Sequence, residues 1–476
     1  MNILDASCRV AFAAMTHDLG KFVQRADKTG NSRFPQDKLD GNTTLYCPFH
    51  EAGGYHSHRH AAYTALAFDE LESKWPDVIK GDMFPFADRT KTETITDSLV
   101  NAAAAHHKPD TYLQWIIAVA DRTASGFERE EFEKYNQAED KTDTGRNHYQ
   151  ARLLSVFEQL LLPTKQGSKD VEYRYPLKAL SPADIFPMRR EECEPDTDSA
   201  AQTEYSALWK AFVEGLDKIP QSHCKSWPLW LDHFDSLWLT FTHAIPSATA
   251  FGIKPDVSLY DHSKATAALA VAMWRYGQIK NGDETATVRN MHDRAGYDEK
   301  KFLLIQGDFF GVQNFIFAEG SQTNKQAAKI LRGRSFQVAL FTELAALRIL
   351  EALNLPSTSQ ITNAAGKFLI VAPNTPNTVE NMQKIRREFD DWFLRHSYGL
   401  VGIIREWYER NPELKGIETV LAIQPPRTRA YERNPELKGI ETLFHRRRNA
   451  LQLGNFSQKT ANRSRIFHTG QAGDFT

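Results

Sequence analysis

The most informative stretch of the chain is residues 6–19, ASCRVAFAAMTHDL. Small or apolar side chains occupy most of each helical turn, and this pattern predicts a buried α-helix. His17 and Asp18 come near its end. A carboxylate that is buried without a partner costs several kcal/mol, so Asp18 is expected to face a cation, a metal ion or hydrogen-bond donors.

A second helical run supplies two more histidines. Residues 98–107 are rich in alanine, and Pro109 stops the run. His106 and His107 are therefore expected at the C-terminal end of a helix.

Two further runs carry single polar residues beside apolar ones. Residues 113–120, LQWIIAVA, have the length and apolar content of a buried helix, and Asp121 follows directly. His60 stands immediately before the helical run AAYTALAF. Several separate helices are thus predicted to point a histidine or an aspartate toward one place.

The chemistry of this set points to a metal-dependent phosphohydrolase. Mixed imidazole and carboxylate ligands suit Mn, Fe, Co, Ni or Zn better than Mg or Ca. Such ions lower the pKa of water and stabilise the charge that develops on a phosphodiester. The predicted reaction is hydrolysis of a phosphate ester.

Other interpretations of the histidines stay open. His56 and His58 lie on either side of Ser57, after a Gly-Gly-Tyr turn, and favour exposed polar positions over metal ligation. For His60 a ligand role and an ordinary surface role are both open. The pair His292-Asp293 has no histidine cluster around it, so the dipeptide alone carries no prediction.

Two candidate ligands also have structural alternatives. Asp121 could pair with Arg122 or Arg129 instead of a metal. His106 could be a charge at a helix C-terminus that complements the helix dipole.

Several motifs resemble a known family in order and spacing. MTHDLGKFVQRA, SHRH, AHHKP and ADRTASGFER, between residues 15 and 129, resemble the N-terminal HD nuclease domain of the large signature subunit of type III CRISPR effector complexes, closest to subtype III-A. GDFFGVQNFIF, LRGRSF and NAAGKFLIVAPN, between residues 307 and 374, resemble that subunit's first palm domain. The resemblance covers residues 1–405.

The resemblance implies an activity and its partners. The HD domain of that family hydrolyses single-stranded DNA with a transition metal, for which Mn, Ni or Co is expected here. Target RNA activates it inside a crRNA-containing complex with small and backbone CRISPR subunits. By motif position the catalytic pair is His17 and Asp18, and the metal ligands are His17, Asp18, His60, His106, His107 and Asp121. Ser125, Gly126 and Arg129 belong to the adjoining structural signature.

The chain also departs from the family pattern. In the family, a second palm domain carries a Gly-Gly-Asp-Asp motif and makes cyclic oligoadenylates from ATP. This motif is absent from the present sequence. The four cysteines form no Cys-x-x-Cys pair, so the zinc module is not expected either. We therefore interpret the chain as truncated, with ATP as a cofactor only if a second palm is present.

The first palm motifs contain a candidate nucleotide contact. Asp308 and Gly311 would face a nucleotide shared with a second palm. The alternative, which we favour for this chain, is a strand-to-helix turn in which Asp308 caps the helix.

The predicted fold class is α+β, an all-α HD-type domain followed by a helical linker and a ferredoxin-like palm built as strand, helix, strand, helix. The expected domains are an HD domain at 1–145, a linker and mostly helical region at 146–295, a first palm at 296–405 and a basic, largely disordered tail at 406–476. The tail contains one segment of 12 residues twice, YERNPELKGIET at 408–419 and 431–442.

Charge and hydropathy add limits. The net charge is -2 and the pI is about 6.8, so the overall charge of the chain gives no indication of nucleic-acid binding. One helix face with several basic residues is a local candidate for nucleic-acid contact. The alternative interpretation is an ordinary solvent-exposed helix face. Its residues are Lys325, Lys329, Arg332 and Arg334. No apolar run reaches membrane-spanning length and no signal peptide is evident, so a cytoplasmic location without membrane association is predicted.

The hypothesis from sequence is a metal-dependent single-strand DNA endonuclease on a fragment of a type III CRISPR large subunit, with no cyclic oligoadenylate synthesis of its own. One rival is a catalytically degenerate scaffold subunit of the crRNA ribonucleoprotein. A second rival is an HD phosphohydrolase of small nucleotides.

Overall fold

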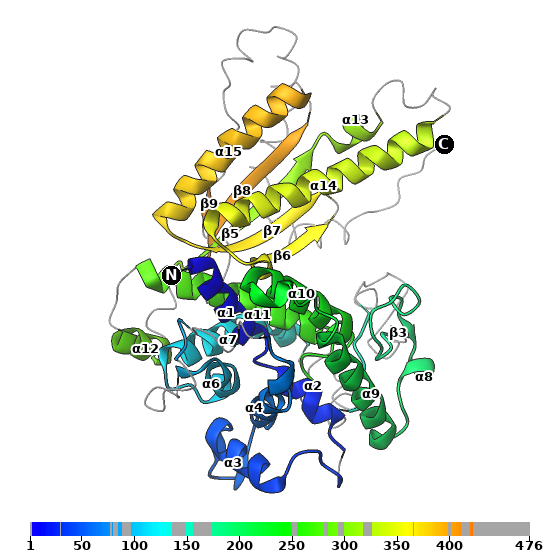
Figure 1. Cartoon of the computed structure of the whole chain (residues 1–476), viewed down its shortest axis with the longest axis vertical. Helices are drawn as coiled ribbons and strands as arrows, with labels where there is room; N and C mark the ends of the chain where they lie inside the picture. Colours follow the sequence, from blue (N-terminus) through cyan, green and yellow to red (C-terminus); the bar gives the residue numbers. More distant parts are fainter. Residues whose placement is uncertain are drawn as a thin grey trace, which may run out of the picture.

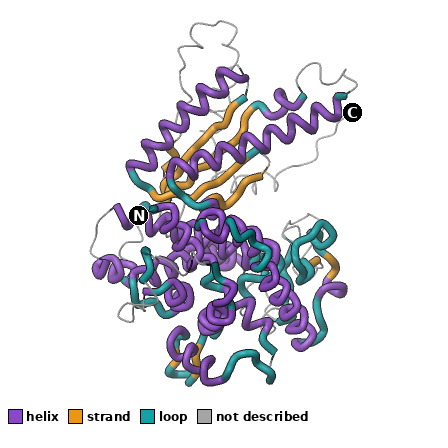
Figure 2. Tube along the Cα trace, in the orientation of Figure 1, coloured by secondary structure: helices purple, strands orange, loops and turns teal. Residues whose placement is uncertain are grey.

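The computed structural model describes most of the chain. The described residues are 2–28, 30–76, 79, 84–87, 97–135, 149–155, 173–249, 255–279, 284–293, 299–317, 326–364, 366–397, 401–410 and 419–421. Helices fill the first part of the chain, and the main β-sheet lies in the second part (Figures 1 and 2). The predicted α+β class is confirmed at the level of its secondary structure, since the chain is mainly helical with a smaller share of strands.

The helical part reaches from the N-terminus to His292. Its helices are α1 (Ile3–Met15), α2 (Leu19–Ala26), α3 (Gln36–Tyr46), α4 (His60–Glu70), α6 (Leu99–Ala104), α7 (Tyr112–Tyr135), α8 (Arg190–Cys193), α9 (Asp198–Leu216), α10 (Trp227–Thr242), α11 (Leu259–Ile279) and α12 (Glu284–His292). Short 3₁₀ turns are η1 (Glu72–Lys74), η3 (Ala105–His107) and η6 (His223–Lys225). Two small hairpins pair β1 (Phe49–His50) with β2 (Tyr55–His56) and β3 (Tyr173–Arg174) with β4 (Met188–Arg189).

The helices expected from the sequence are present, with different ends. The first helix stops at Met15, which leaves His17 and Asp18 in a tight turn before α2. The Ala-rich run forms α6, and its last residues tighten into η3. Asp121 lies inside α7 and not beyond it.

An aromatic core holds the helical part together. Phe12 of α1 packs edge-on against Trp230 of α10 with ring centroids 4.9 Å apart, and against Phe234 at 5.0 Å. Trp75 meets the same ring at 5.6 Å. Each buried aromatic ring removes a large apolar area from water, so this cluster fixes α10 on α1.

The helices after residue 145 do not form a separate body. Helix α11 packs against both α1 and α7, and α9 packs against α2. Arg25 of α2 also donates to the carbonyl of Pro246 at 2.9 Å. The predicted boundary at 145 therefore separates stretches of sequence that share one core.

The second part is a sheet with two long helices on one face (Figure 1). Its strands are β5 (Phe302–Phe310), β6 (Gln360–Ala364), β7 (Lys367–Pro373), β8 (Gly402–Arg410) and β9 (Thr419–Leu421), in the spatial order β6-β7-β5-β8-β9 with every pair antiparallel. The helices are α13 (Val312–Ile316), α14 (Ala327–Leu353) and α15 (Pro376–Ser397), and η7 spans Ser357–Ser359. Strands β5 to β8 and their helices give the order β-α-β-β-α-β.

The pairing of β5 with β8 extends the sheet beyond residue 405, the predicted end of the palm domain. Register pairs run from Phe302↔Arg410 to Phe310↔Gly402, so β8 crosses the expected boundary at 405. Only the first three residues of the first repeat copy, 408–410, and its last residue lie in described strands. The second copy at 431–442 lies outside the described residues.

Helix α11 joins the two parts. It packs against β7, β6 and η7 as well as against α1 and α7. The Arg275 guanidinium near its end donates to the carbonyl of Asn354 at 2.8 Å and to that of Leu353 at 3.3 Å. These carbonyls belong to the C-terminus of α14, whose last acceptors have no partner within the helix.

Candidate metal centre

The turn between α1 and α2 carries the first two site residues into the interior. Thr16 donates its hydroxyl to the carbonyl of Phe12 at 2.7 Å, which closes α1. His17 and Asp18 follow, with 0% and 1% of their surfaces exposed. Burial this complete demands compensation for the carboxylate.

A glycine brings α4 against this turn. A Cβ on Gly20 would lie 1.8 Å from the carbonyl oxygen of His60, so only glycine permits the close approach of α2 and α4. The Thr64 hydroxyl accepts from Gly20 N at 3.0 Å and donates to the His17 carbonyl at 2.8 Å. This contact places His60 beside Asp18.

Two of the histidines are oriented by backbone carbonyls. Nδ1 of His17 donates to the carbonyl of Ala14 at 2.6 Å, and Nδ1 of His106 donates to that of Ala103 at 2.8 Å. Because Nδ1 carries the proton, the lone pair of each neutral ring is on Nε2, which faces the site. Metal-binding histidines are commonly fixed in this way.

Helices α7 and α11 complete the cluster. Asp121 projects from α7, and its Oδ1 lies 3.6 Å from Nε2 of His17. His262, in the first turn of α11, places Nε2 3.1 Å from the same Oδ1. His262 is only 3% exposed, so the site is closed on this side.

The two carboxylate oxygens of Asp18 face different histidines. Oδ2 lies 3.3 Å from Nε2 of His17 and 3.4 Å from Nε2 of His262. Oδ1 lies 3.3 Å from Nε2 of His60 and 3.8 Å from Nε2 of His106. Asp18 is therefore the shared centre of two donor groups.

His107 extends the second group. Its Nε2 lies 2.9 Å from Nε2 of His60, and with His106 these rings can direct three nitrogens toward one ion. The first group can do the same with His17, Asp121 and His262.

The electrostatics give the protonation states that metal ligands need. Burial and the neighbouring His17 lower the pKa of His106 to about 4, and burial lowers the pKa values of His60 and His107 well below the ordinary value. These rings are neutral at pH 7, as ligation requires.

The carboxylates stay ionised for another reason. Burial raises the pKa of Asp18, but the Lys21 ammonium, 2.5 Å from Oδ2, and His17 outweigh it and hold the net pKa well below the usual range. The pKa of Asp121 also lies well below the usual range, because His17 and His262 lower it by more than burial raises it. In His17 itself burial lowers the pKa, but the two aspartates raise it further, so the net pKa lies above the ordinary value.

The donor set fits a divalent transition metal. Within the described residues, Oδ1 of Asp18 and Nε2 of His106 have no hydrogen-bond partner, whereas Oδ2 of Asp18 lies 2.5 Å from the Lys21 ammonium. Two ligands at about 2.1 Å from one ion lie roughly 3.0 Å apart at a right angle and roughly 3.4 Å apart at a tetrahedral angle. The distance of 2.9 Å between Nε2 of His60 and Nε2 of His107, and the distances of 3.3 and 3.8 Å from Oδ1 of Asp18 to His60 and His106, cover this range.

The structure decides between the alternatives left open by the sequence. The Arg122 guanidinium lies over the Trp115 ring, 5.3 Å from its centroid, while Asp121 faces His17 and His262. The side chain of Arg129 lies outside the described residues. His106 is buried and neutral, so the interpretation as a helix-dipole charge is wrong.

The other two histidines of the loop have different surroundings. His56 Nδ1 donates to the carbonyl of Cys47 at 3.1 Å. His58 is exposed, in the left-handed region at φ 55°, and its ring lies 3.9 Å from that of His107 between centroids. Neither belongs to the three ligand groups that the described residues can form.

Sequence reasoning assembled six of these residues and missed His262. All six come together although they arise from four separate segments. The missed signal is in the stretch SLYDHSKATAALA, where a histidine in the first turn of a helix is followed by a buried Ala-rich run, as His60 is in α4.

The residues predicted for the palm lie elsewhere. Asp308 is inside β5 and pairs across the sheet with Lys367, 3.8 Å between Oδ2 and Nζ. Gly311 is the N-cap of α13 at φ 78° and no side chain caps that helix, so the predicted cap by Asp308 is wrong.

The basic face is only partly described. Lys329 and Arg332 are exposed on α14, and the Arg334 guanidinium donates to the carbonyl of Ile316 at 3.3 Å. Lys325 lies outside the described residues.

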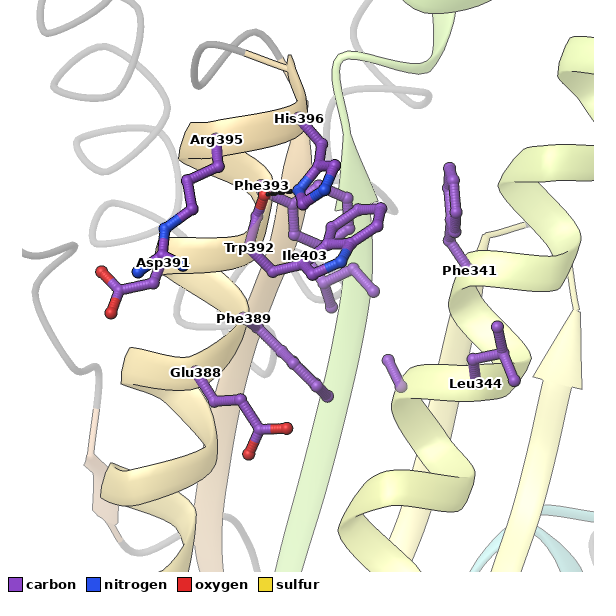
Figure 3. Close-up of a pocket in the computed structure, with 11 residues that line it drawn as sticks. Phe341, Leu344, Glu388, Phe389, Asp391, Trp392, Phe393, Arg395, His396 and Ile403 are labelled. Atoms are coloured by element: carbon purple, nitrogen blue, oxygen red, sulfur yellow. Dashed lines mark hydrogen bonds between the residues drawn. The ribbon is translucent and has the colours of Figure 1, made fainter.

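An open groove of about 510 Å³ lies between α14 and α15 (Figure 3). Phe341 and Leu344 line it from α14, and Phe389 and Trp392 from α15. None of its lining residues belongs to the histidine cluster, so we assign the chemistry to the cluster and not to the groove.

A buried histidine–aspartate cluster thus lies in a helical body that is followed by a β-α-β-β-α-β unit. The family model described as Csm1 subunit domain B matches residues 301–413, which is the sheet part. The chain is therefore a relative of the Cas10/Csm1 large subunits of subtype III-A.

Individual relatives agree over most of the chain. The CRISPR system single-strand-specific deoxyribonuclease Cas10/Csm1 of Thermococcus onnurineus is 28% identical over 83% of this chain and 42% of its own length. That of Methanocaldococcus jannaschii is 26% identical over 79% of this chain and 42% of its own length. The chain thus spans about two fifths of the length of these curated relatives.

A solved structure agrees in fold. The crystal structure of a Csm1-Csm4 cassette in complex with pppApApA matches with a TM-score of 0.53 and 24% identity, over 87% of this chain and 46% of that chain. Within the described residues, no helix has both the length and the apolar character that crossing a membrane requires.

Proposed function

We propose that this chain is a metal-dependent endonuclease of single-stranded DNA, acting through the His/Asp cluster of an HD-type domain in a type III-A CRISPR effector. The observation that carries the proposal is the cluster itself, in which six buried or half-buried donor residues surround Asp18. The relatives that are named single-strand-specific deoxyribonucleases support the choice of substrate.

The chain's own residues prepare the site for a divalent ion. When bound, such an ion acidifies water and stabilises the charge on the phosphodiester that is cut. The carbonyls of Ala14 and Ala103 hold Nδ1 of His17 and His106, so that Nε2 of each ring is aimed inward and carries the lone pair when the ring is neutral. The Lys21 ammonium, 20% exposed, offers a cation at the edge of the cluster that can hold a substrate phosphate.

The division of donors around Asp18 supports two metal positions. His17, Asp121 and His262 would hold one ion, and His60, His106 and His107 the other. Asp18 would serve both, since its oxygens face opposite groups. Mn, Ni or Co suits this mixture of imidazole and carboxylate ligands.

The sheet part and the partners complete the proposal. We assign the β-α-β-β-α-β unit as the ferredoxin-like palm of such a subunit, because the family model for domain B covers it. A crRNA-containing complex with small and backbone subunits would be its setting, with target RNA as activator.

The test is degradation of labelled single-stranded DNA by the purified chain with Mn or Ni. The double variant His17→Ala, Asp18→Ala should abolish cleavage and reduce bound metal. The matched control is His292→Ala, Asp293→Ala, because this second His-Asp pair is exposed, at 68% and 55% of the side chains.

Each other outcome has a meaning. Cleavage that survives in the His17→Ala, Asp18→Ala variant would disprove the assignment of the site. Hydrolysis of mononucleotides without cleavage of oligonucleotides would favour a small-nucleotide phosphohydrolase. Stoichiometric metal without any hydrolysis, alone and after assembly with crRNA and partner subunits, would favour a scaffold.

A further inference from the structure

The β1–β2 hairpin displays aromatic rings that the core does not use. Phe49 is opposite His56 and His50 is opposite Tyr55, so each face of the two-residue strands carries one pair. The ring centroids are 4.9 Å apart in the first pair and 5.2 Å in the second, which is stacked. Phe49 is 54% exposed and Tyr55 is 57% exposed.

The turn of the hairpin holds Tyr55 in place. The amides of Gly53 and Gly54 donate to the carbonyl of His50 at 3.1 and 2.8 Å. A Cβ on Gly53 would lie 2.4 Å from the Tyr55 ring, so the ring lies directly over this glycine. An exposed ring with so little freedom loses little entropy when a flat partner stacks on it.

The hairpin is continuous with the metal centre. Only Ser57 to Arg59 separate β2 from His60, the first residue of α4. Ser57 N donates to the Pro48 carbonyl at 2.9 Å and anchors the strand ends. The next residue, His58, covers the ring of His107.

The charges beside this path suit a phosphodiester. Lys21 lies at the edge of the cluster. Arg59, which directly precedes His60, and Lys108, which directly follows His107, both have exposed side chains. Glu51, in the turn, is the only acidic residue between positions 47 and 60.

We infer that the hairpin at 49–56 is a base-stacking platform for single-stranded DNA, with Tyr55 as its main contact, leading the strand to the metal centre. The inference rests on the proposed function. Aromatic rings bind single strands because every base has a flat face, whatever the sequence. Because Tyr55 and His60 are close in the chain, a strand stacked on Tyr55 would have a phosphate within a few nucleotides of the metal centre.

The test separates stacking from phosphate contact. Binding of a short labelled oligothymidylate is measured by fluorescence anisotropy in EDTA, so that no cleavage occurs, together with an abasic strand of the same length. Tyr55→Ala should weaken binding of the oligothymidylate at least fivefold, the lower end of what one lost base stack costs, and leave the abasic strand unchanged. Tyr55→Trp should retain binding.

Two more variants sharpen the result. Glu51→Gln should tighten binding of both strands, because it removes the anion of the hairpin. Phe186→Ala is the matched control, since Phe186 is 70% exposed and lies outside the helical core. Each variant must retain the wild-type thermal shift on Mn addition, which shows that the metal centre is folded.

Equal binding of oligothymidylate by Tyr55→Ala and wild type would overturn the inference. The inference would also be overturned if the chain bound RNA but not DNA, or if Tyr55→Ala weakened binding of the abasic strand as much as binding of oligothymidylate. Cleavage of DNA by the wild-type chain is measured separately with Mn. Its failure would count against the proposed function, while normal cleavage with unaltered binding by Tyr55→Ala would count only against the platform.

Discussion

Nε2 of His262 lies 3.4 Å from Oδ2 of Asp18, although 244 residues separate them in the sequence. Asp18 stands at the start of the chain, and His262 opens the helix that packs against the sheet part. The candidate metal centre is thus closed by a helix that also contacts β7 and η7.

We predict that His262→Ala impairs the metal centre as severely as His17→Ala. The loss of a ligand should lower metal affinity by more than the ~10- to 100-fold that loss of a supporting residue causes. Isothermal titration with Mn measures this. His292→Ala is the control, and wild-type affinity in His262→Ala would exclude a ligand role.

Gly20→Ala should destabilise the chain, because the added Cβ overlaps the backbone of α4 at 1.8 Å. Overpacking in a buried contact typically costs ~1–3 kcal/mol, and a backbone obstacle gives no relief. Gly41→Ala is the matched control, since nothing lies within 4 Å of its Cβ in α3 and alanine favours a helix. In urea unfolding, the free energy of unfolding should fall for Gly20→Ala and rise for Gly41→Ala.

Lys21→Met should destabilise the metal-free chain and increase its thermal shift on Mn addition. The buried carboxylate of Asp18 loses its nearest cation, at a cost of about 2–3 kcal/mol, less than for a fully buried pair because Lys21 is 20% exposed. Lys74→Met is the control, because the pair of Lys74 with Asp217 is exposed. An equal Mn shift in wild type and Lys21→Met would contradict this account.

The same pair predicts a pH dependence. Burial raises the pKa of Asp18, but Lys21 and His17 outweigh it, so the folded pKa lies well below the unfolded value. The stability from this pair is therefore present at neutral pH and is lost as the pH falls through the folded pKa. In Lys21→Met the loss should begin at a higher pH, which acid unfolding followed by circular dichroism can measure without metal.

Arg275→Met should lower the unfolding free energy by ~1–3 kcal/mol, because the carbonyls of Leu353 and Asn354 lose a charged donor. Arg348→Met, which breaks an exposed ion pair with Glu388, should change it by less than ~1 kcal/mol. Chemical denaturation of the two variants compares them directly. Equal effects would mean that the contact between α11 and α14 contributes nothing beyond a surface pair.

The local patterns of this sequence determined its elements well. Alanine content and apolar periodicity predicted the helix that ends just before His17, the helix that leads into the turn of His106 and the helix that bears Asp121, because buried side chains recur on a helix at helical spacing. The run KFLLIQGD at 301–308 likewise predicts a strand, which the structure places at Phe302–Phe310, and the block at 327–353 predicts the helix α14. Residue chemistry then selected a metal centre, since buried carboxylates and paired histidines need a common cation.

Tertiary structure alone decided the rest. No periodicity could place His262 beside Asp18, because the packing of α11 between α1 and α7 depends on contacts distant in the sequence. The end of β8 at Arg410 was likewise set by its partner β5, since a strand extends as far as its neighbour supplies hydrogen bonds. The division of the donors around the two oxygens of Asp18 follows from the same packing, and a linear sequence carries no record of it.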